Sequence, residues 1–444
     1  MGEDNINSKI IFAALILFVL LGLTCVSAAD SNHTDIADRE NSLSTSEISD
    51  DLPNQANAES LENADLKADL ANNIYVNGSK TDDGDGSVAN PYNNLKSAFT
   101  NADDDYTINI APGTYTGSNN VGLTIEKKLT LTCWTIGDVI LDGENNSQIF
   151  TVKAADFYIN GLTFINGNGY EGGAICFENN GTITNCNFAN NTASSYGGAI
   201  YFNKNARIEG SNFSNNRGSY GGAVYTYGRY TTINNSKFDN NTATLYDGGA
   251  VQAQNVNLAI LYNCTFTNNN ATGNGGGAKI ARGIVRKCEF INNTANGYGA
   301  LNIYSTNGIV EDCTFTSNYC DSKGGALQAD RSNITNCIFN NNAVEYSGGA
   351  IDGYGNNITN CSFNNNRALQ YDGGAVCGGN RIINCTFTNN SAKNGGAIEF
   401  EQTSTVINCT FTNNHASDSG GAINFYIGGN VINCNFTGNS APYG

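Results

Sequence analysis

A repeat of about 25 residues occurs eleven times between Gly172 and the C-terminus, and it constrains the fold more than any other feature of this sequence. Each unit begins with Gly-Ala, in most units as Gly-Gly-Ala followed by an aliphatic residue. The alanines are Ala174, Ala199, Ala223, Ala250, Ala278, Ala300, Ala326, Ala350, Ala375, Ala397 and Ala422. A second mark, Cys-x-Phe, follows about twelve residues later, with the phenylalanine present in every unit: Phe188, Phe213, Phe238, Phe266, Phe290, Phe315, Phe339, Phe363, Phe387, Phe411 and Phe436. A fixed period of this length indicates stacked structural units.

The composition of each unit favours strands over helices. Helical repeats need long runs with a periodicity of about 3.6 residues, and no such run occurs here. The first unit instead carries two short β-prone stretches, 174–177 and 182–188, bounded by Gly and Asn. One coil of three short strands per repeat is typical of a parallel β-helix. We therefore predict an all-β parallel β-helix, in which equivalent residues stack about 4.8 Å apart along the axis.

The residue before the cysteine position predicts a sharp corner in each coil. This residue is Asn in eight units, Gly210 or Asp312 in two others, and Lys287 in the remaining one. Asn, Gly and Asp tolerate the left-handed (αL) backbone conformation, and stacked Asn side chains can hydrogen-bond along the axis. We therefore expect an αL corner with an asparagine ladder, and a local irregularity at Lys287.

The Phe and Cys columns are expected inside the coil. The phenylalanines should form an aromatic stack, and the cysteines, replaced by Ser211 and Ser236 in two units, should fill a small slot beside it. Metal sites need clusters such as Cys-x-x-Cys, and one cysteine per coil does not supply one. The Cα atoms of cysteines in neighbouring layers lie close enough for a disulfide. In a long column, however, each cysteine has a neighbour on both sides, and no pairing is favoured over another. We expect buried, reduced thiols and no metal site.

The segment before the β-rich region has a different composition. Residues 1–29 have the features of a secretory signal peptide, because Lys9 precedes an apolar run from Ile10 to Val26 that ends in small residues. An uncleaved membrane anchor is the alternative, and no other membrane contact is predicted. Residues 30–72 contain eleven Asp and Glu and no periodic apolar face, so we predict a disordered acidic linker.

Residues 73–165 are predicted to form an N-terminal cap and the first coils of the β-helix. A short helix at 93–101, with Phe99 facing inward, would cover the strand edges at this end. The Asp/Gly loop at 82–86 lacks the full calcium-binding pattern and is predicted to be a solvated turn. Short strands are predicted at 74–76, 107–110, 123–125, 129–132, 139–141, 149–152, 157–159 and 162–164.

Residues 166–444 are predicted to form the eleven-repeat β-helix. The chain ends where the next Gly-Gly-Ala is due, and we expect it to be truncated at the C-terminus.

Charge and composition exclude several classes of function. The net charge of −18 and the pI of 4.4 argue against nucleic acid and anionic membranes as partners. With only two His and one Met, the chain has few side chains for imidazole or redox chemistry, and we predict no cofactor.

The sequence does not indicate an enzyme. Acidic residues such as Asp352 and those before Gly-Gly (Glu171, Asp247 and Asp372) are expected to pair only by chance along a stacked rod. The cationic cluster of Arg282, Arg286 and Lys287 is the only candidate for the base of a lyase. We predict no catalytic residue.

Seven tyrosines precede the glycines that open the units, in nearly the same phase of the repeat. They are Tyr170, Tyr196, Tyr220, Tyr246, Tyr298, Tyr346 and Tyr371. An exposed aromatic ladder suits stacking against sugar rings or peptide surfaces, and simple stacking at a turn is the alternative. These tyrosines are the candidate ligand-binding residues, with surface glycans or proteins of neighbouring cells as the partners.

Two sets of motifs resemble known families. Gly-Gly-Ala-Ile combined with Phe-x-x-Asn, as at 188–191, resembles the repeats of chlamydial polymorphic outer membrane proteins. Ile-Tyr-Val-Asn-Gly at 74–78, Ile-Ala-Pro-Gly-Thr-Tyr at 110–115 and Ile-Leu-Asp-Gly at 140–143 are similar to segments of adhesin-like β-helix proteins of methanogenic archaea. The resemblance covers residues 74–444. It implies a right-handed, single-stranded, pectin-lyase-like solenoid in a secreted, adhesive surface protein.

The leading hypothesis from the sequence is therefore a secreted cell-surface adhesin, a rigid rod that binds host, microbial or glycan surfaces. A polysaccharide lyase or hydrolase of the same fold is one alternative, and a purely structural spacer is the other.

Overall fold

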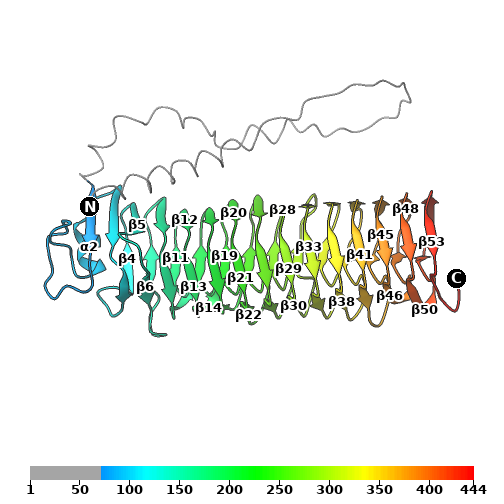
Figure 1. Ribbon diagram of the computed structural model, residues 1–444, viewed down its shortest axis with the longest axis horizontal. Coiled ribbons are helices and arrows are strands. Elements are labelled where there is room, and N and C mark those ends of the chain that lie inside the picture. The colour runs from blue at the N-terminus through cyan, green and yellow to red at the C-terminus, as the bar shows by residue number, and fades with distance from the viewer. Residues whose placement is uncertain (1–71) are drawn as a thin grey trace, which may run out of the picture. The chain divides into compact units, whose positions relative to one another are not determined.

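The computed structural model describes residues 72–444, which wind into a parallel β-helix (Figure 1). The predicted signal peptide at 1–29 and nearly all of the predicted acidic linker at 30–72 lie outside the described residues. Each regular coil visits four sheets, which we name A, B, D and C in chain order. All pairings between named strands are parallel, for example between Phe315 and Phe339 in consecutive layers. The predicted all-β solenoid is confirmed.

The bounds of the strands follow the four sheets. Sheet A contains β1 (Asn73–Val76), β2 (Tyr106–Ile110), β5 (Leu129–Cys133), β8 (Phe157–Asn160), β12 (Gly181–Thr184), β16 (Ala206–Glu209), β20 (Tyr230–Asn234), β24 (Leu258–Tyr262), β28 (Gly283–Arg286), β32 (Ile309–Glu311), β36 (Asn333–Thr335), β40 (Asn357–Thr359), β44 (Arg381–Ile383), β48 (Ser404–Ile407) and β52 (Gly429–Ile432). Sheet B contains β3 (Gly113–Tyr115), β6 (Val139–Asp142), β9 (Thr163–Ile165), β13 (Asn187–Ala189), β17 (Asn212–Ser214), β21 (Lys237–Asp239), β25 (Thr265–Thr267), β29 (Glu289–Ile291), β33 (Thr314–Thr316), β37 (Ile338–Asn340), β41 (Ser362–Asn364), β45 (Thr386–Thr388), β49 (Thr410–Thr412) and β53 (Asn435–Thr437).

Sheet C contains β4 (Leu123–Ile125), β7 (Phe150–Val152), β11 (Ile175–Phe177), β15 (Ile200–Phe202), β19 (Val224–Thr226), β23 (Val251–Ala253), β27 (Ala278–Ile280), β31 (Leu301–Ile303), β35 (Leu327–Ala329), β39 (Ile351–Asp352), β43 (Val376–Cys377), β47 (Ile398–Phe400) and β51 (Ile423–Phe425). Sheet D contains β10 (Asn168–Glu171), β14 (Thr192–Tyr196), β18 (Arg217–Gly218), β22 (Thr242–Ala243), β26 (Asn270–Ala271), β30 (Thr294–Ala295), β34 (Tyr319–Cys320), β38 (Ala343–Val344), β42 (Arg367–Ala368), β46 (Ser391–Asn394) and β50 (His415–Ser419).

Sheet D corrects the expectation of three strands per coil. Its strands lie between the Phe-x-x-Asn and Gly-Gly motifs, and several span only two residues, such as Arg217–Gly218. They are rich in Ala, Ser and Thr rather than in large β-branched residues, so their β propensity is weak and they were not predicted. Their small inward residues, including Ala295 and Cys320, form a narrow second core.

The predicted N-terminal cap is confirmed. The single helix of the described residues, α2 (Leu95–Asn101), begins after Asn94, whose side chain accepts a hydrogen bond from Ser97 N. Leu95, Ala98 and Phe99 face the core, and the Phe99 ring packs edge-on against Phe150 at 5.7 Å. This helix is too short to cross a membrane, and no other helix occurs in 72–444.

The Asp/Gly loop at 82–86 is a hydrogen-bonded turn. Asp83 accepts hydrogen bonds from Asn93 N and Ser97 Oγ, and Asp85 accepts one from Ser87 N. The loop thereby joins the first strand to the cap.

The phenylalanine column is the core of the solenoid. The rings of Phe315 and Phe339 lie 4.9 Å apart with an interplanar angle of 4°, as the axial register predicted. The same parallel stacking runs through every layer from Phe164 to Phe436, and the rings are fully buried except at the C-terminal end. The alanine column has one exception, because Ala278 pairs with Val251 and Gly277 takes the alanine position.

The two glycines before the alanine have different roles. The first of the pair has a positive φ, as at Gly221 with 58°. The second has no room for a side chain, because a Cβ on Gly222 would lie 2.0 Å from Gly249 O. Both roles require glycine, so Gly-Gly marks the turn from sheet D to sheet C.

The αL corner before the cysteine column is present in all eleven units, Lys287 included, with a φ of 52°. The irregularity predicted at Lys287 is therefore wrong. Lys287 N donates to Glu311 O in the next layer at 3.0 Å, and this interlayer bonding holds the lysine in a conformation that non-glycine residues rarely adopt.

A second αL corner follows the phenylalanine and was not predicted. It is occupied by Asn in most layers, as at Asn341 with a φ of 57°, and by Ser317 and Gly438 in two. The motif Phe-x-Asn-Asn was the available signal, since it places an αL-tolerant residue at a fixed offset.

The asparagine ladder lies at a different position from the one predicted. Its members directly follow the second corner and are buried, except at the last layer: Asn191, Asn216, Asn241, Asn269, Asn293, Asn318, Asn342, Asn366, Asn390, Asn414 and Asn439. Asn342 Nδ2 donates to Phe315 O and to Asn366 Oδ1, both at 3.0 Å. The asparagines before the cysteines are exposed and are bonded in some layers only, as between Asn360 and Asn336 at 3.4 Å.

The cysteine column lies inside the coil, as expected. All described cysteines are free thiols, and within the column only Cys434, in the last layer, is not fully buried. Cys361 N donates to Cys385 Sγ at 3.3 Å, so each sulfur takes part in the interlayer bonding.

Replacing Asn342 by Ala should destabilise the rod much more than replacing an exposed asparagine. The substitution leaves Phe315 O and Asn318 N without their partners, and each buried unsatisfied group costs about 1–3 kcal/mol. The free energy of unfolding, measured by urea denaturation, should fall clearly for Asn342→Ala. For the control Asn357→Ala, on the exposed face of β40, it should stay within about 0.5 kcal/mol of the wild-type value. Equal effects would contradict the assigned role of the ladder.

Candidate functional site

The seven predicted tyrosines do not form one ladder. Tyr196, Tyr220 and Tyr246 stack in consecutive layers, with ring centroids 5.1 and 4.0 Å apart. Tyr346 and Tyr371 form a second, separate stack at 5.3 Å. Tyr170 and Tyr298 are exposed and stack on no aromatic ring within 72–444. The column is interrupted because Asn274 and Lys323 occupy its phase in intervening layers.

Two further tyrosines, missed from the sequence, extend the first stack. Tyr201 and Tyr225 point outward from β15 and β19, between residues that face the core. Tyr225 lies 4.6 Å from Tyr196 and 5.9 Å from Tyr201. The alternation in Ile-Tyr-Phe and Val-Tyr-Thr was the signal for an outward tyrosine. Burial raises the pKa of Tyr201 to about 12, and its hydroxyl donates a hydrogen bond to Asn203 Oδ1 at 3.3 Å.

These tyrosines belong to a longer surface, which we call the outer corner. It comprises the outward column of sheet C and the residues just before each Gly-Gly turn. The outward column is Cys176, Tyr201, Tyr225, Gln252, Lys279, Asn302, Gln328, Asp352, Cys377, Glu399 and Asn424.

The two walls of the outer corner meet through ion pairs as well as rings. Asp247, before its Gly-Gly turn, bonds Lys279 Nζ at 2.5 Å. Lys323, in the equivalent turn position, lies 3.9 Å from Asp352 Oδ1. Most of the outward column is buried although it points away from the core. Asp247 is thus a structural residue held by Lys279 and by the amide of Asn274.

The C-terminal half of the outer corner is acidic. Burial raises the pKa of Asp352 to about 7, although Lys323 opposes the shift. Burial likewise raises the pKa of Glu399 to about 7, although a hydrogen bond from Asn424 opposes the shift. Glu401 accepts a hydrogen bond from the hydroxyl of Tyr354 and one from Cys377 Sγ at 3.8 Å.

The acidic residues of this segment act on one another electrostatically. Asp352 is affected by Glu401 and Asp330, and Glu399 is affected by Asp372 and Glu401. Asp372 also accepts a hydrogen bond from the side chain of Asn394. The cationic residues Arg286 and Lys287 lie away from this group, since Arg286 pairs with Glu311 and Lys287 lies over the ring of Tyr262. No group of three His, Cys, Asp or Glu within 72–444 is arranged to hold a metal ion.

Two buried acceptors of the outer corner have no hydrogen-bond partner: Gln252 Oε1 and Glu399 Oε2. Buried polar groups are nearly always bonded. Both atoms are shielded from solvent, and a hydrogen-bond donor that reached either of them would stabilise it.

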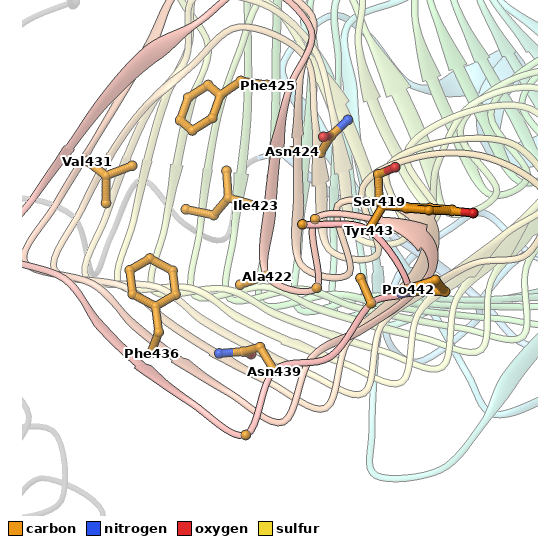
Figure 2. A pocket seen from close by; sticks show the side chains of 15 residues that line it. Ser419, Ala422, Ile423, Asn424, Phe425, Val431, Phe436, Asn439, Pro442 and Tyr443 are labelled. Carbon is orange, nitrogen blue, oxygen red and sulfur yellow. The ribbon is translucent and has the colours of Figure 1, made fainter.

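One cavity among residues 72–444 is the open end of the last coil and not a site built for a ligand (Figure 2). Its volume is about 810 Å³, and its walls include Ala422, Ile423, Phe425 and Phe436, which continue the columns of the core. A smaller cavity of about 210 Å³ lies between Gly355 and Ser404, where the chain passes from sheet C to sheet A.

Comparison with known families identifies the fold. The family described as the right handed beta helix region matches residues 129–283 and 252–411. The chain belongs to the right-handed β-helix family. The Chlamydia polymorphic membrane protein repeat matches residues 408–426, which fits a surface protein. A search of curated proteins finds no match.

Solved structures of similar fold include two polysaccharide lyases. A rhamnogalacturonan lyase aligns with a TM-score of 0.41 and 13% identity over 65% of this chain and 81% of its own. The pectate lyase Pel9A aligns with a TM-score of 0.37 and 14% identity over 65% of this chain and 80% of its own. At these identities the likeness concerns the fold alone.

The raised pKa of Asp352 predicts a pH-dependent cost in stability. Between pH 4 and 7 the folded state holds a proton on Asp352 that the unfolded state releases, so stability falls as pH rises through this window. Each unit of pKa shift corresponds to about 1.4 kcal/mol. We expect Asp352→Asn to match wild type near pH 4 and to melt several degrees higher at pH 8, by differential scanning calorimetry. The exposed control Glu289→Gln should follow wild type throughout; a constant offset for Asp352→Asn would refute the linkage.

Proposed function

We propose that this chain is a secreted cell-surface adhesin, a rigid rod that binds a linear glycan along its outer corner. The observation that carries the proposal is the tyrosine cluster of Tyr196, Tyr201, Tyr220, Tyr225 and Tyr246, which presents ring faces and hydroxyls on adjoining layers. Such side chains combine apolar contact with a polar end. Tyr246 retains 46% exposure, so part of this aromatic surface is open to a ligand.

The form of the rod supports a role in extended binding. Gln252, Asn302 and Gln328 continue the outward column between the tyrosines and the carboxylates, and amides donate and accept hydrogen bonds. Gln252 and Asn302 are buried, so a linear ligand would meet the partly exposed Gln328 and the exposed turn residues Tyr246 and Tyr298, in layers about 4.8 Å apart. The match to the polymorphic membrane protein repeat and the signal-like residues 1–29 favour exposure at a cell surface.

A polysaccharide lyase or hydrolase is the second candidate. The observation that favours it is the pair Asp352 and Glu399, because carboxyl groups with a pKa near 7 suit general acid–base chemistry. Release of reducing ends from a bound glycan would identify an enzyme. Binding without release favours the adhesin, and the absence of both favours a spacer.

Glycan binding should depend on the tyrosine cluster. We expect the full chain to bind members of a glycan array, and Tyr220→Ala and Tyr246→Ala each to weaken that binding about tenfold by removing a stacked ring. Tyr230→Ala is the matched control, because Tyr230 lies on sheet A with the same 46% exposure as Tyr246. Retention of full affinity in both cluster variants, or equal loss in the control, would exclude this surface as the binding site.

A further inference from the structure

The acidic half of the outer corner has a surplus of negative charge. Asp352 and Glu399 stand two layers apart in the outward column, with Cys377 between them. Asp330 and Glu401 each follow that column by two residues in their layers. Within 72–444, the one cation paired with any of these four carboxylates is Lys323, at 3.9 Å from Asp352.

Glu399 supplies an independent indication of a missing partner. Its side chain lies outward of the core residues Ile398 and Phe400, yet Glu399 is only 4% exposed. Its Oε1 accepts a hydrogen bond from Asn424 Nδ2 at 3.2 Å, whereas Oε2 has no partner. An unpaired buried carboxylate oxygen is costly, so a hydrogen-bond donor that reaches Glu399 Oε2 would stabilise this site.

We infer that this acidic segment binds primary ammonium groups, and that the glycan ligand is therefore an amino-sugar polymer rather than an acidic polysaccharide. The inference rests on the glycan binding proposed above and names the class of glycan. An ammonium group offers three donors, and charge-assisted bonds to carboxylates are roughly twice as strong as neutral ones. A polyuronate would bring further negative charge to a site that already carries an excess.

Glu401 is placed to meet the ligand first. It is partly exposed, and it interacts electrostatically with both Asp352 and Glu399. An ammonium near Glu401 therefore lies within the field of all three carboxylates. Its positive charge would favour the ionised forms of Asp352 and Glu399, so binding near pH 7 should release protons.

The test compares three hexasaccharides by isothermal titration calorimetry with the full chain at pH 6.5: glucosamine, N-acetylglucosamine and galacturonate oligomers. The first two differ only in the free amine. We expect the glucosamine oligomer to bind at least tenfold more tightly than the acetylated one, and the galacturonate oligomer to bind most weakly. Equal affinities for the first two, or a preference for galacturonate, would overturn the inference alone. Absence of binding by all glycans tested would overturn the proposed function with it.

Charge-removing variants distinguish the preference for ammonium groups from glycan binding itself. In Glu399→Gln and Glu401→Gln, we expect the preference for the glucosamine oligomer over the acetylated oligomer to disappear. Tyr220→Ala should weaken both oligomers, and Glu289→Gln, an exposed carboxylate on sheet B, should change neither.

Two measurements on the wild-type chain, of salt dependence and of proton release, test the ammonium site without any variant. Affinity for the amine should fall as salt rises, because the attraction is screened, and titrations in two buffers of different ionisation enthalpy should show proton release. A salt-independent preference without proton release would contradict an ammonium site.

Discussion

The hydrogen bonding of each coil to the next holds this structure together. Backbone groups that would be unsatisfied in a lone coil are paired above and below, and the side chains repeat the pattern. The Asn342 amide joins three layers at once, from Phe315 O to Asn366 Oδ1. Because every layer must offer the same groups at the same height, the sequence can vary only where a side chain leaves this network. That constraint explains the repeat, and it explains why Lys287 adopts the αL corner of its neighbours.

The fold was largely predictable from the sequence because the interlayer contacts require identical residues. The phenylalanine stack, the cysteine column and the capping helix each follow from a residue type at a fixed position. The errors have a common cause. Sheet D has strands of small residues with weak β propensity, and the second αL corner lies in a run of two or three asparagines in which the sequence alone does not separate the strained residue from the buried one.

The candidate site was less predictable because it is formed where the repeat is broken. The outward column of sheet C changes from tyrosine to amide to carboxylate along the rod, and none of these residues is needed by the core. The tyrosines before Gly-Gly were visible in the sequence, but their partners Tyr201 and Tyr225 are reached across a turn. Likewise, Asp352 and Glu399 are separated by 47 positions in the numbering yet lie two layers apart. Such proximity depends on the length of each coil, which varies from unit to unit.

The nearly parallel phenylalanine rings have a mechanical consequence. The planes of successive rings from Phe315 to Phe387 differ by only 2–4°, and the strands that carry them pair residue for residue in every layer. Side chains of one column therefore lie on the same wall of the solenoid over many layers. A stiff polymer laid along the column would engage successive layers without bending, and weak contacts would add as linked binding events do, through effective concentration rather than through any single strong bond.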